Sequence, residues 1–321
     1  MRGMKGTCLL VLVASLTMSG VAFAKGGDSG DKSGVVKPTV GEPASASSTQ
    51  ESHRYIDLGL TGKQGEVRGG YELWFEDNPR PGSNLDAGMQ LGGSVTIIKN
   101  LDVGIGGVRV GLPIERNSGL MAIQFAKPAG WGDFDFWARY TVFKNDKFEI
   151  APDVRLRAGT NTYFRGGMEF GGTVRARLVK NLVLDYGLQF KILKYGFHSN
   201  RASFFASARS FHSPGANFDI TIPVQALYSI TDRIFIGGRI GLGFVGLGQD
   251  AHVIIPLAVR GGYSIPIDKA KINAIHVYSE LGTDTFIASN VSGSAVKANY
   301  WHITFGALVK TDSLFSFGKN K

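Results

Sequence analysis

Apolar and polar residues alternate strictly along several stretches of this chain. From Phe218 to Ile230 every second residue is apolar or aromatic, and the residues between them are mostly polar. A period of two is typical of a β-strand with one apolar and one polar face. The pattern recurs in about twelve segments of roughly ten to fourteen residues, which is longer than the roughly five or six residues usual for strands of soluble sheets.

Short and long connections alternate between these segments. Lys99-Asn100, Lys180-Asn181 and Thr231-Asp232 are short polar turns, whereas 113–133 and 193–217 are long connections. In transmembrane β-barrels the short turns lie in the periplasm and the long loops lie outside. The predicted strands cover 66–75, 85–98, 101–112, 134–143, 148–158, 167–179, 182–192, 218–230, 234–244, 252–265, 272–283 and 298–311.

We therefore expect an all-β fold, a transmembrane antiparallel up-and-down β-barrel of about 12 strands with both termini periplasmic. Adding residues 54–61 and 119–127 as strands gives an alternative of about 14 and preserves the even number. A helical membrane protein is not indicated, because no apolar span of roughly 20 residues follows the first two dozen residues.

Prolines and a glycine pair mark irregular places in the predicted strands. Pro152, Pro223 and Pro256 each remove a ladder donor, so we expect a bulge at each of them. The apolar phase of 101–112 changes after Ile105, and Gly106-Gly107 would permit a further bulge there.

The chain resembles bacterial outer-membrane β-barrel proteins as a class over roughly residues 54–311. Trp301, Ile303 and Phe305 begin a well-alternating last strand, which is how such barrels commonly close, although here the chain continues to Lys321. The resemblance implies a barrel domain over 53–321 in a bacterial outer membrane, surrounded by lipid and lipopolysaccharide. We expect it to be a monomer.

The first 52 residues are not expected to belong to the barrel. Arg2 and Lys5 precede an apolar run, and Ala22-Phe23-Ala24 has the small-x-small pattern of a cleavage site, so 1–24 is predicted to be a signal peptide. Residues 25–52 are dense in Gly, Ser, Lys and Ala and are predicted to be a disordered periplasmic leader.

Composition excludes several other classes of function. Cys8 is the only cysteine and lies in the signal peptide, so the mature chain has no disulfide and no thiolate metal site. Without Arg2 and Lys5, 33 basic residues face 26 acidic ones, a net charge of +7, and they form no cluster of the kind that binds nucleic acid. The six histidines lack metal-ligand spacing. We expect no metal and no cofactor; Gly241 to Gly246 matches a dinucleotide pattern, but another strand follows it rather than a helix.

If the apolar phase faces lipid, the other phase faces the lumen and is densely charged. One interpretation is a water-filled pore in which Arg155, Arg157, Arg175 and Arg177 favour anionic solutes. The other is a non-transporting structural or surface-binding barrel with a charge-paired lumen. Twelve strands lie between filled and open barrels, so strand number does not decide. The predicted lumen-lining residues are Arg139, Glu149, Asp153, Arg155, Arg157, Glu169, Arg175, Arg177, Asp185, Lys191, Arg239 and Arg260.

We predict a small porin-like diffusion channel for hydrophilic, anionic solutes and no enzymatic activity. The long connection 193–217 carries candidate contacts to an external ligand such as lipopolysaccharide phosphate, namely His198, Arg201, Arg209 and His212. His198 and Ser199 keep an outer-membrane lipid hydrolase as a distant alternative, although adjacent side chains diverge on a strand.

Overall fold

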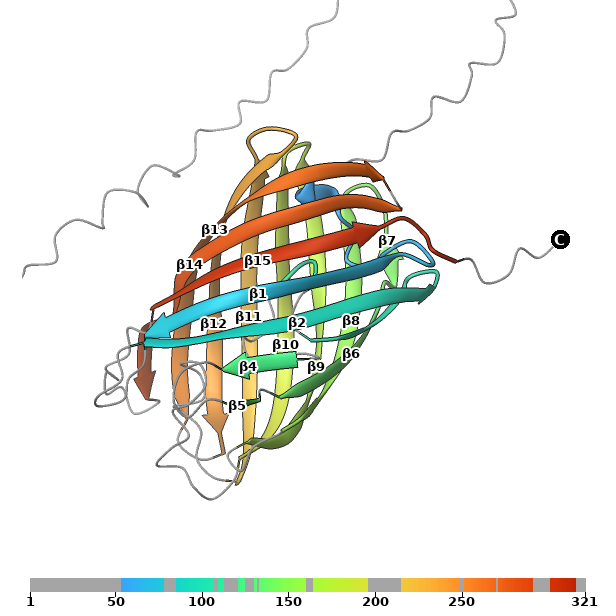
Figure 1. Ribbon diagram of the computed structural model, residues 1–321. Coiled ribbons are helices and arrows are strands. Elements are labelled where there is room, and N and C mark those ends of the chain that lie inside the picture. Colours follow the sequence, from blue (N-terminus) through green and yellow to red (C-terminus); the bar gives the residue numbers. More distant parts are fainter. Residues whose placement is uncertain are drawn as a thin grey trace, which may run out of the picture. The chain divides into compact units, whose positions relative to one another are not determined.

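Twelve antiparallel strands close into a β-barrel (Figure 1). Strands that follow one another pair along the wall, and β1 pairs with both β2 and β15, which closes the ring. The up-and-down topology and the count of twelve are thus confirmed. The barrel strands are β1 (Val67–Asp77), β2 (Leu85–Ile98), β3 (Leu101–Ile105), β6 (Phe134–Tyr140), β8 (Phe148–Ala158), β9 (Phe164–Val179), β10 (Leu182–Tyr195), β11 (Gly215–Ser229), β12 (Ile234–Leu247), β13 (His252–Lys269), β14 (Ile272–Asn290) and β15 (Trp301–Thr311).

This computed structural model describes part of the chain, all of it within the unit Glu51–Lys321. The predicted signal peptide and leader lie outside the described residues and stay predictions. Over the described residues, no helix is long and apolar enough to span a membrane. The described ranges are 53–77, 85–106, 109–112, 121–124, 130–131, 133–159, 164–195, 215–248, 251–269, 271–290 and 301–315.

Exposure alternates along the strands as the sequence pattern predicts. On β8, Phe148, Ile150 and Leu156 are exposed on the outside of the barrel, whereas Glu149 and Arg155 are buried inside. The other strands repeat this arrangement, so the outer surface is covered with exposed large apolar side chains. A continuous apolar surface of this kind is unstable in water and is suited to lipid.

The predicted strand 101–112 is wrong beyond Ile105. Gly106 has φ +82°, a left-handed conformation, and turns the chain out of the wall instead of forming a bulge within it. Val110 and Leu112, which were expected to face lipid, are 1% and 0% exposed inside the barrel.

The two extra segments of the fourteen-strand alternative do not join the barrel. Residues 54–61 contain the short 3₁₀ turn η2 (Tyr55–Asp57) instead of a strand. Of 119–127 the structure describes 121–124, which form β4 (Met121–Gln124); it pairs with β2 beyond the end of β3 and with the two-residue β5 (Gly130–Trp131).

Of the three prolines, Pro256 lies at a register shift on β13, as expected. At Pro152 the register shifts by one residue on the β6 side, since Arg139 pairs with Asp153 and Phe143 pairs with Ile150, while the pairing with Gly172 on β9 is regular. The bulge expected at Pro223 is wrong, since Pro223 pairs in register with Gly241. Next to Pro152, the wall is interrupted between β6 and β7 (Phe143–Lys144).

Candidate functional site in the barrel lumen

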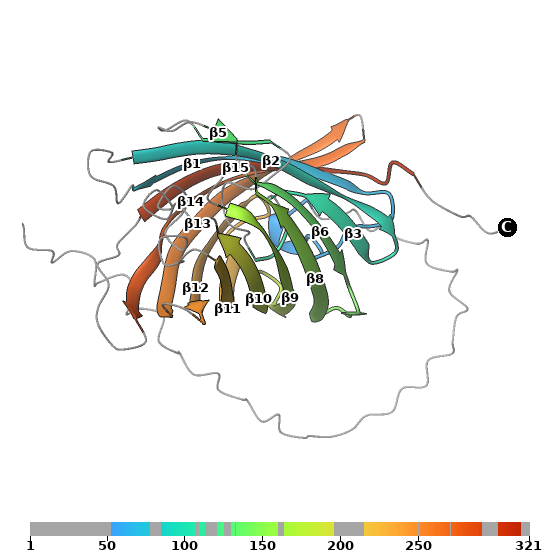
Figure 2. The same cartoon turned by 90° about the horizontal axis from the view of Figure 1, so that it is seen from below.

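Residues 53–66, here called the plug, lie inside the ring of strands at the end where the short turns are (Figure 2). His53 bonds Asn273 on β14 (3.0 Å), and Arg54 donates to Asn181 in the β9–β10 turn (2.9 Å). The backbone N–H of Gly62 donates to Asp102 on β3 (3.2 Å). The plug therefore contacts the wall at three separate places around its circumference.

The first part of the plug is held by an apolar cluster. The Tyr55 ring is stacked on Phe235, with ring centroids 4.6 Å apart and planes 11° from parallel. Burial raises the pKa of the Tyr55 phenol, so this ring stays neutral at ordinary pH. The cluster consists of Tyr55, Ile56, Leu58, Val110, Val183, Leu227, Phe235, Tyr278 and Leu308.

The second part of the plug is bound through its backbone by charged side chains of the wall. Arg175 donates to the carbonyl oxygen of Leu58, and Arg139 donates to that of Leu60 at 3.4 Å. Glu149 accepts the backbone N–H of Leu60 at 2.9 Å. These bonds satisfy backbone groups that would otherwise be buried without partners.

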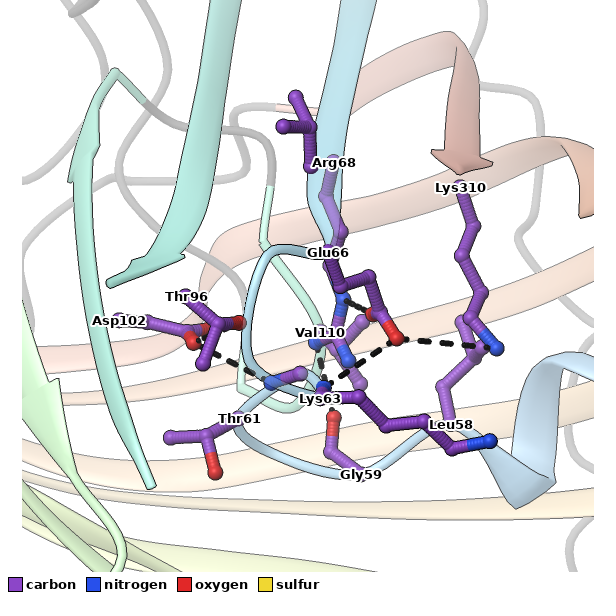
Figure 3. A network of polar contacts seen from close by, with 12 residues as sticks. Leu58, Gly59, Thr61, Lys63, Glu66, Arg68, Thr96, Asp102, Val110 and Lys310 are labelled. Carbon is purple, nitrogen blue, oxygen red and sulfur yellow. Dashed lines mark hydrogen bonds and ion pairs between the residues drawn. The ribbon is translucent and has the colours of Figure 1, made fainter. Parts of the chain in front are cut away.

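The end of the plug is held next to β1 and β15, the first and last strands of the barrel (Figure 3). Arg68 donates to Glu66 (2.6 Å) and to the carbonyl of Gly59 (2.9 Å), and Lys310 lies 3.8 Å from Glu66. The backbone N–H of Leu314 donates to the carbonyl of Gly65 at 2.8 Å. The segment after β15 therefore also contacts the end of the plug.

A second segment, residues 109–112, enters the lumen after Gly106. Arg139 donates to the Val110 carbonyl (2.8 Å), and Gln225 donates to the Gly111 carbonyl (3.4 Å). Arg109 lies 3.3 Å from Asp153. Because Val110 belongs to the same apolar cluster as Tyr55, the two inserted segments pack as one body within the barrel.

The predicted lumen-lining residues are buried or half-buried inside the barrel, where the structure pairs nearly all of them. Lys191 is buried on β10 and lies in register between Glu169 and Asp219. The ion pairs are Arg155 with Asp135 and Glu169, Arg157 with Glu169, Arg175 with Asp185, Arg139 with Asp153, Arg177 with Glu149, and Arg239 and Arg260 with Glu280. That they line a conducting pore stays a prediction.

Sequence reasoning missed the acidic partners Asp135 and Glu280 and the plug itself. Glu280 contacts Arg239 (2.9 Å), Arg260 (3.0 Å) and His302 (3.1 Å), which makes it the centre of a second charged cluster. Asp135 occupies the inward phase of its strand, so the alternation could have identified it. The candidate external contacts His198, Arg201, Arg209 and His212 lie outside the described residues and stay predictions.

No group of three or more His, Cys, Asp or Glu residues that could hold a metal ion occurs in the described part of the chain. The chemistry available in the lumen is hydrogen bonding and charge: guanidinium groups that donate to oxygen, and carboxylates that accept from N–H or O–H groups.

A closed antiparallel barrel with an apolar outside and a charged inside defines a transmembrane β-barrel protein of the bacterial outer membrane. No family model and no curated protein matches the sequence.

Three solved structures illustrate the likeness in fold. The KdgM porin is 13% identical with a TM-score of 0.41, and covers 78% of this chain and 99% of its own. The NanC porin is 11% identical with a TM-score of 0.42, covering 77% of this chain and 98% of its own. The outer membrane channel DcaP of Acinetobacter baumannii is 9% identical with a TM-score of 0.34, covering 77% of this chain and 95% of its own. Likenesses this distant assign nothing further, and the barrel is defined by its own strand pairing.

Proposed function

We propose that this protein is a porin-like channel of the outer membrane that passes small hydrophilic solutes and prefers anionic ones. The observation that carries the proposal is the inner wall. Charged side chains occupy its inward positions along the strands, beginning at the short-turn end. Such a wall interacts favourably with a hydrated solute. In a barrel filled only with apolar side chains, burying these charges would cost free energy. The structure is then the closed state, with the plug in the lumen.

The preference for anions is attributed to the arginine cluster on β8 and β9. Arg155, Arg157 and Arg175 are buried against carboxylates, whereas the side chain of Arg177 is 23% exposed. Arg177 lies 3.5 Å from Glu149, a longer contact than the 2.7 Å between Arg175 and Asp185. Its charge is therefore the one in the cluster that is most accessible to a passing solute.

Planar-bilayer conductance of the purified protein tests both statements. Discrete current steps are expected, with anion selectivity that falls by roughly twofold in Arg177→Gln, as loss of one partly screened charge would give. Lys144→Gln is the matched control, because Lys144 contacts the same Glu149 at 3.6 Å but has a side chain that is 48% exposed at the rim. Equal loss of selectivity in both variants would contradict the role of Arg177.

A second candidate is a non-transporting barrel that binds a surface partner. The observation favouring it is the packing of the charges: Arg139, Arg155 and Arg175 are 1%, 2% and 0% exposed. Correctly folded protein that stays silent in bilayers, with and without an intact plug, would support this candidate and contradict the channel.

A further inference from the structure

Three charged groups of the wall bind the plug through its backbone. Arg175 and Arg139 donate to two carbonyl oxygens, those of Leu58 and Leu60, and Glu149 accepts the N–H groups of Leu60 and Thr61 at 2.9 and 3.4 Å. None of these bonds depends on a side chain of the plug. To these wall groups the stretch presents two oxygen acceptors and two donors, which a small polar solute can also present.

The same three wall residues keep counter-ions that do not belong to the plug. Arg175 forms two bonds to Asp185 (2.7 and 2.8 Å), and Arg139 lies 3.3 Å from Asp153. Glu149 lies 3.5 Å from Arg177. Withdrawal of residues 58–60 from these three wall residues therefore leaves each of them with a charged partner, and a buried ion is costly mainly when it has none.

The fit of the plug also depends on glycine at closely packed positions. A Cβ atom at Gly62 would lie 2.3 Å from Oγ1 of Thr96 and 2.9 Å from Oε1 of Glu66. Thr96 itself donates to Asp102, the carboxylate that accepts the N–H of Gly62. One added methyl group at this position would disturb the contact between plug and wall without changing the wall's charges.

We propose that the plug is displaceable and that Arg139, Arg175 and Glu149 form a solute-binding site that its backbone occupies in the closed state. The ligand class is a small polyhydroxy carboxylate. Its carboxylate would take the place of the Leu58 and Leu60 carbonyls at the two guanidinium groups, and a hydroxyl would donate to Glu149. The inference rests on the proposed channel function and names the site through which that channel selects its solute.

A cysteine pair can lock the plug, since the mature chain has no other cysteine. The hydroxyl oxygens of Thr61 in the plug and Thr141 next to β6 are 2.8 Å apart and buried, a suitable separation for a disulfide. In Thr61→Cys/Thr141→Cys, oxidation is expected to abolish current steps and reduction to restore them. Thr61→Ser/Thr141→Ser, which keeps the hydroxyl pair, should not respond to oxidant.

Loosening the plug gives the complementary measurement. Gly62→Ala is expected to raise the fraction of time spent open severalfold above that of the native protein. Gly69→Ala on β1 is the matched control, because its added Cβ would meet nothing within 4 Å. This pair keeps the proposal testable even if the disulfide fails to form.

Competition identifies the ligand class. Gluconate, a polyhydroxy carboxylate, is expected to raise the open fraction of the native channel, whereas the neutral polyol sorbitol at the same concentration is not. Equal effects of the two compounds would overturn the proposed site, even if the plug moves.

These experiments distinguish failure of the displaceable plug from failure of the channel function. The displaceable plug is overturned if current persists unchanged in the oxidised cysteine pair. It is also overturned if Gly62→Ala and Gly69→Ala give the same current. Either result leaves the channel function unaffected. Silence of all variants, including the reduced pair and Gly62→Ala, overturns the channel itself.

Discussion

Tyr55 connects the plug to three aromatic side chains of the wall. Its ring is stacked on Phe235 and meets His276 edge-on at 5.5 Å and 72°, with Tyr278 also nearby at 6.4 Å. Aromatic pairs of this geometry contribute about 0.5–1.5 kcal/mol beyond the area they bury. One residue thus provides a measurable share of the free energy that holds the plug in place.

Replacing Tyr55 tests this directly. Tyr55→Ala is expected to lower the free energy of plug binding by about 1 kcal/mol or more, which is roughly a fivefold change in the population of the released plug. Limited proteolysis within 53–66 should speed up accordingly, while Tyr55→Phe, which keeps the stacked ring, should be cleaved at nearly the native rate. Equal cleavage of all three proteins would show that the stack does not hold the plug.

Gly106 decides where a wall strand ends and an inserted segment begins. Its φ of +82° costs little for glycine but about 1–2 kcal/mol for a residue with a Cβ. Because Ile105 still pairs with Phe136 on β6, the turn follows directly on regular pairing. The left-handed conformation of Gly106 thus ends the wall strand before the inserted segment 109–112.

Gly106→Ala is therefore expected to destabilise the folded barrel by about 1–2 kcal/mol. Urea unfolding of protein refolded in lipid, followed by tryptophan fluorescence, gives the change in unfolding free energy. Gly69→Ala, whose added atom has open space, should stay within about 0.5 kcal/mol of the native value. If both variants unfold alike, the left-handed turn is not required.

Much of the wall could be predicted from sequence because alternation is imposed locally by the lipid. The segments 85–98 and 148–158 match β2 and β8 to the residue. The predicted strands 252–265 and 272–283 end too early, because β13 continues to Lys269 and β14 to Asn290. Both strands continue to pair beyond the segment in which apolar residues alternate.

The plug could not be predicted in the same way. The alternation of Ile56, Leu58 and Leu60 made 54–61 a candidate strand instead, and the binding site of the plug is formed by side chains from many strands that meet only in the closed barrel. Apolar residues at inward positions, including Val183, Leu227 and Phe235, were the one available signal. These apolar residues interrupt the otherwise polar inward face, and contact of the outer face with lipid does not explain that interruption. The individual ion pairs likewise depend on register, which alternation leaves open.

The barrel has a direction, since the plug and the described segment after β15 both lie at the short-turn end. An epitope inserted within 196–214 is expected to be labelled by antibody on intact cells. One inserted in the Thr231–Arg233 turn should be labelled only after the outer membrane is permeabilised. The second site avoids Asn181, whose contact with Arg54 holds the plug. Reversed labelling would invert the sidedness and place the plug at the cell surface.

The residues that hold the plug come from β2, β3, β6, β8, β9, β12, β14 and β15 and from the segment after β15. No single hairpin presents this combination, although the plug precedes every strand in the chain. We therefore expect docking of the plug to be completed only after β1 has paired with β15. Until then the nascent barrel contains an empty, hydrated lumen and an accessible N-terminal segment. A protected plug consequently reports completed membrane insertion, and it could distinguish finished barrels from stalled ones in the assembly pathway.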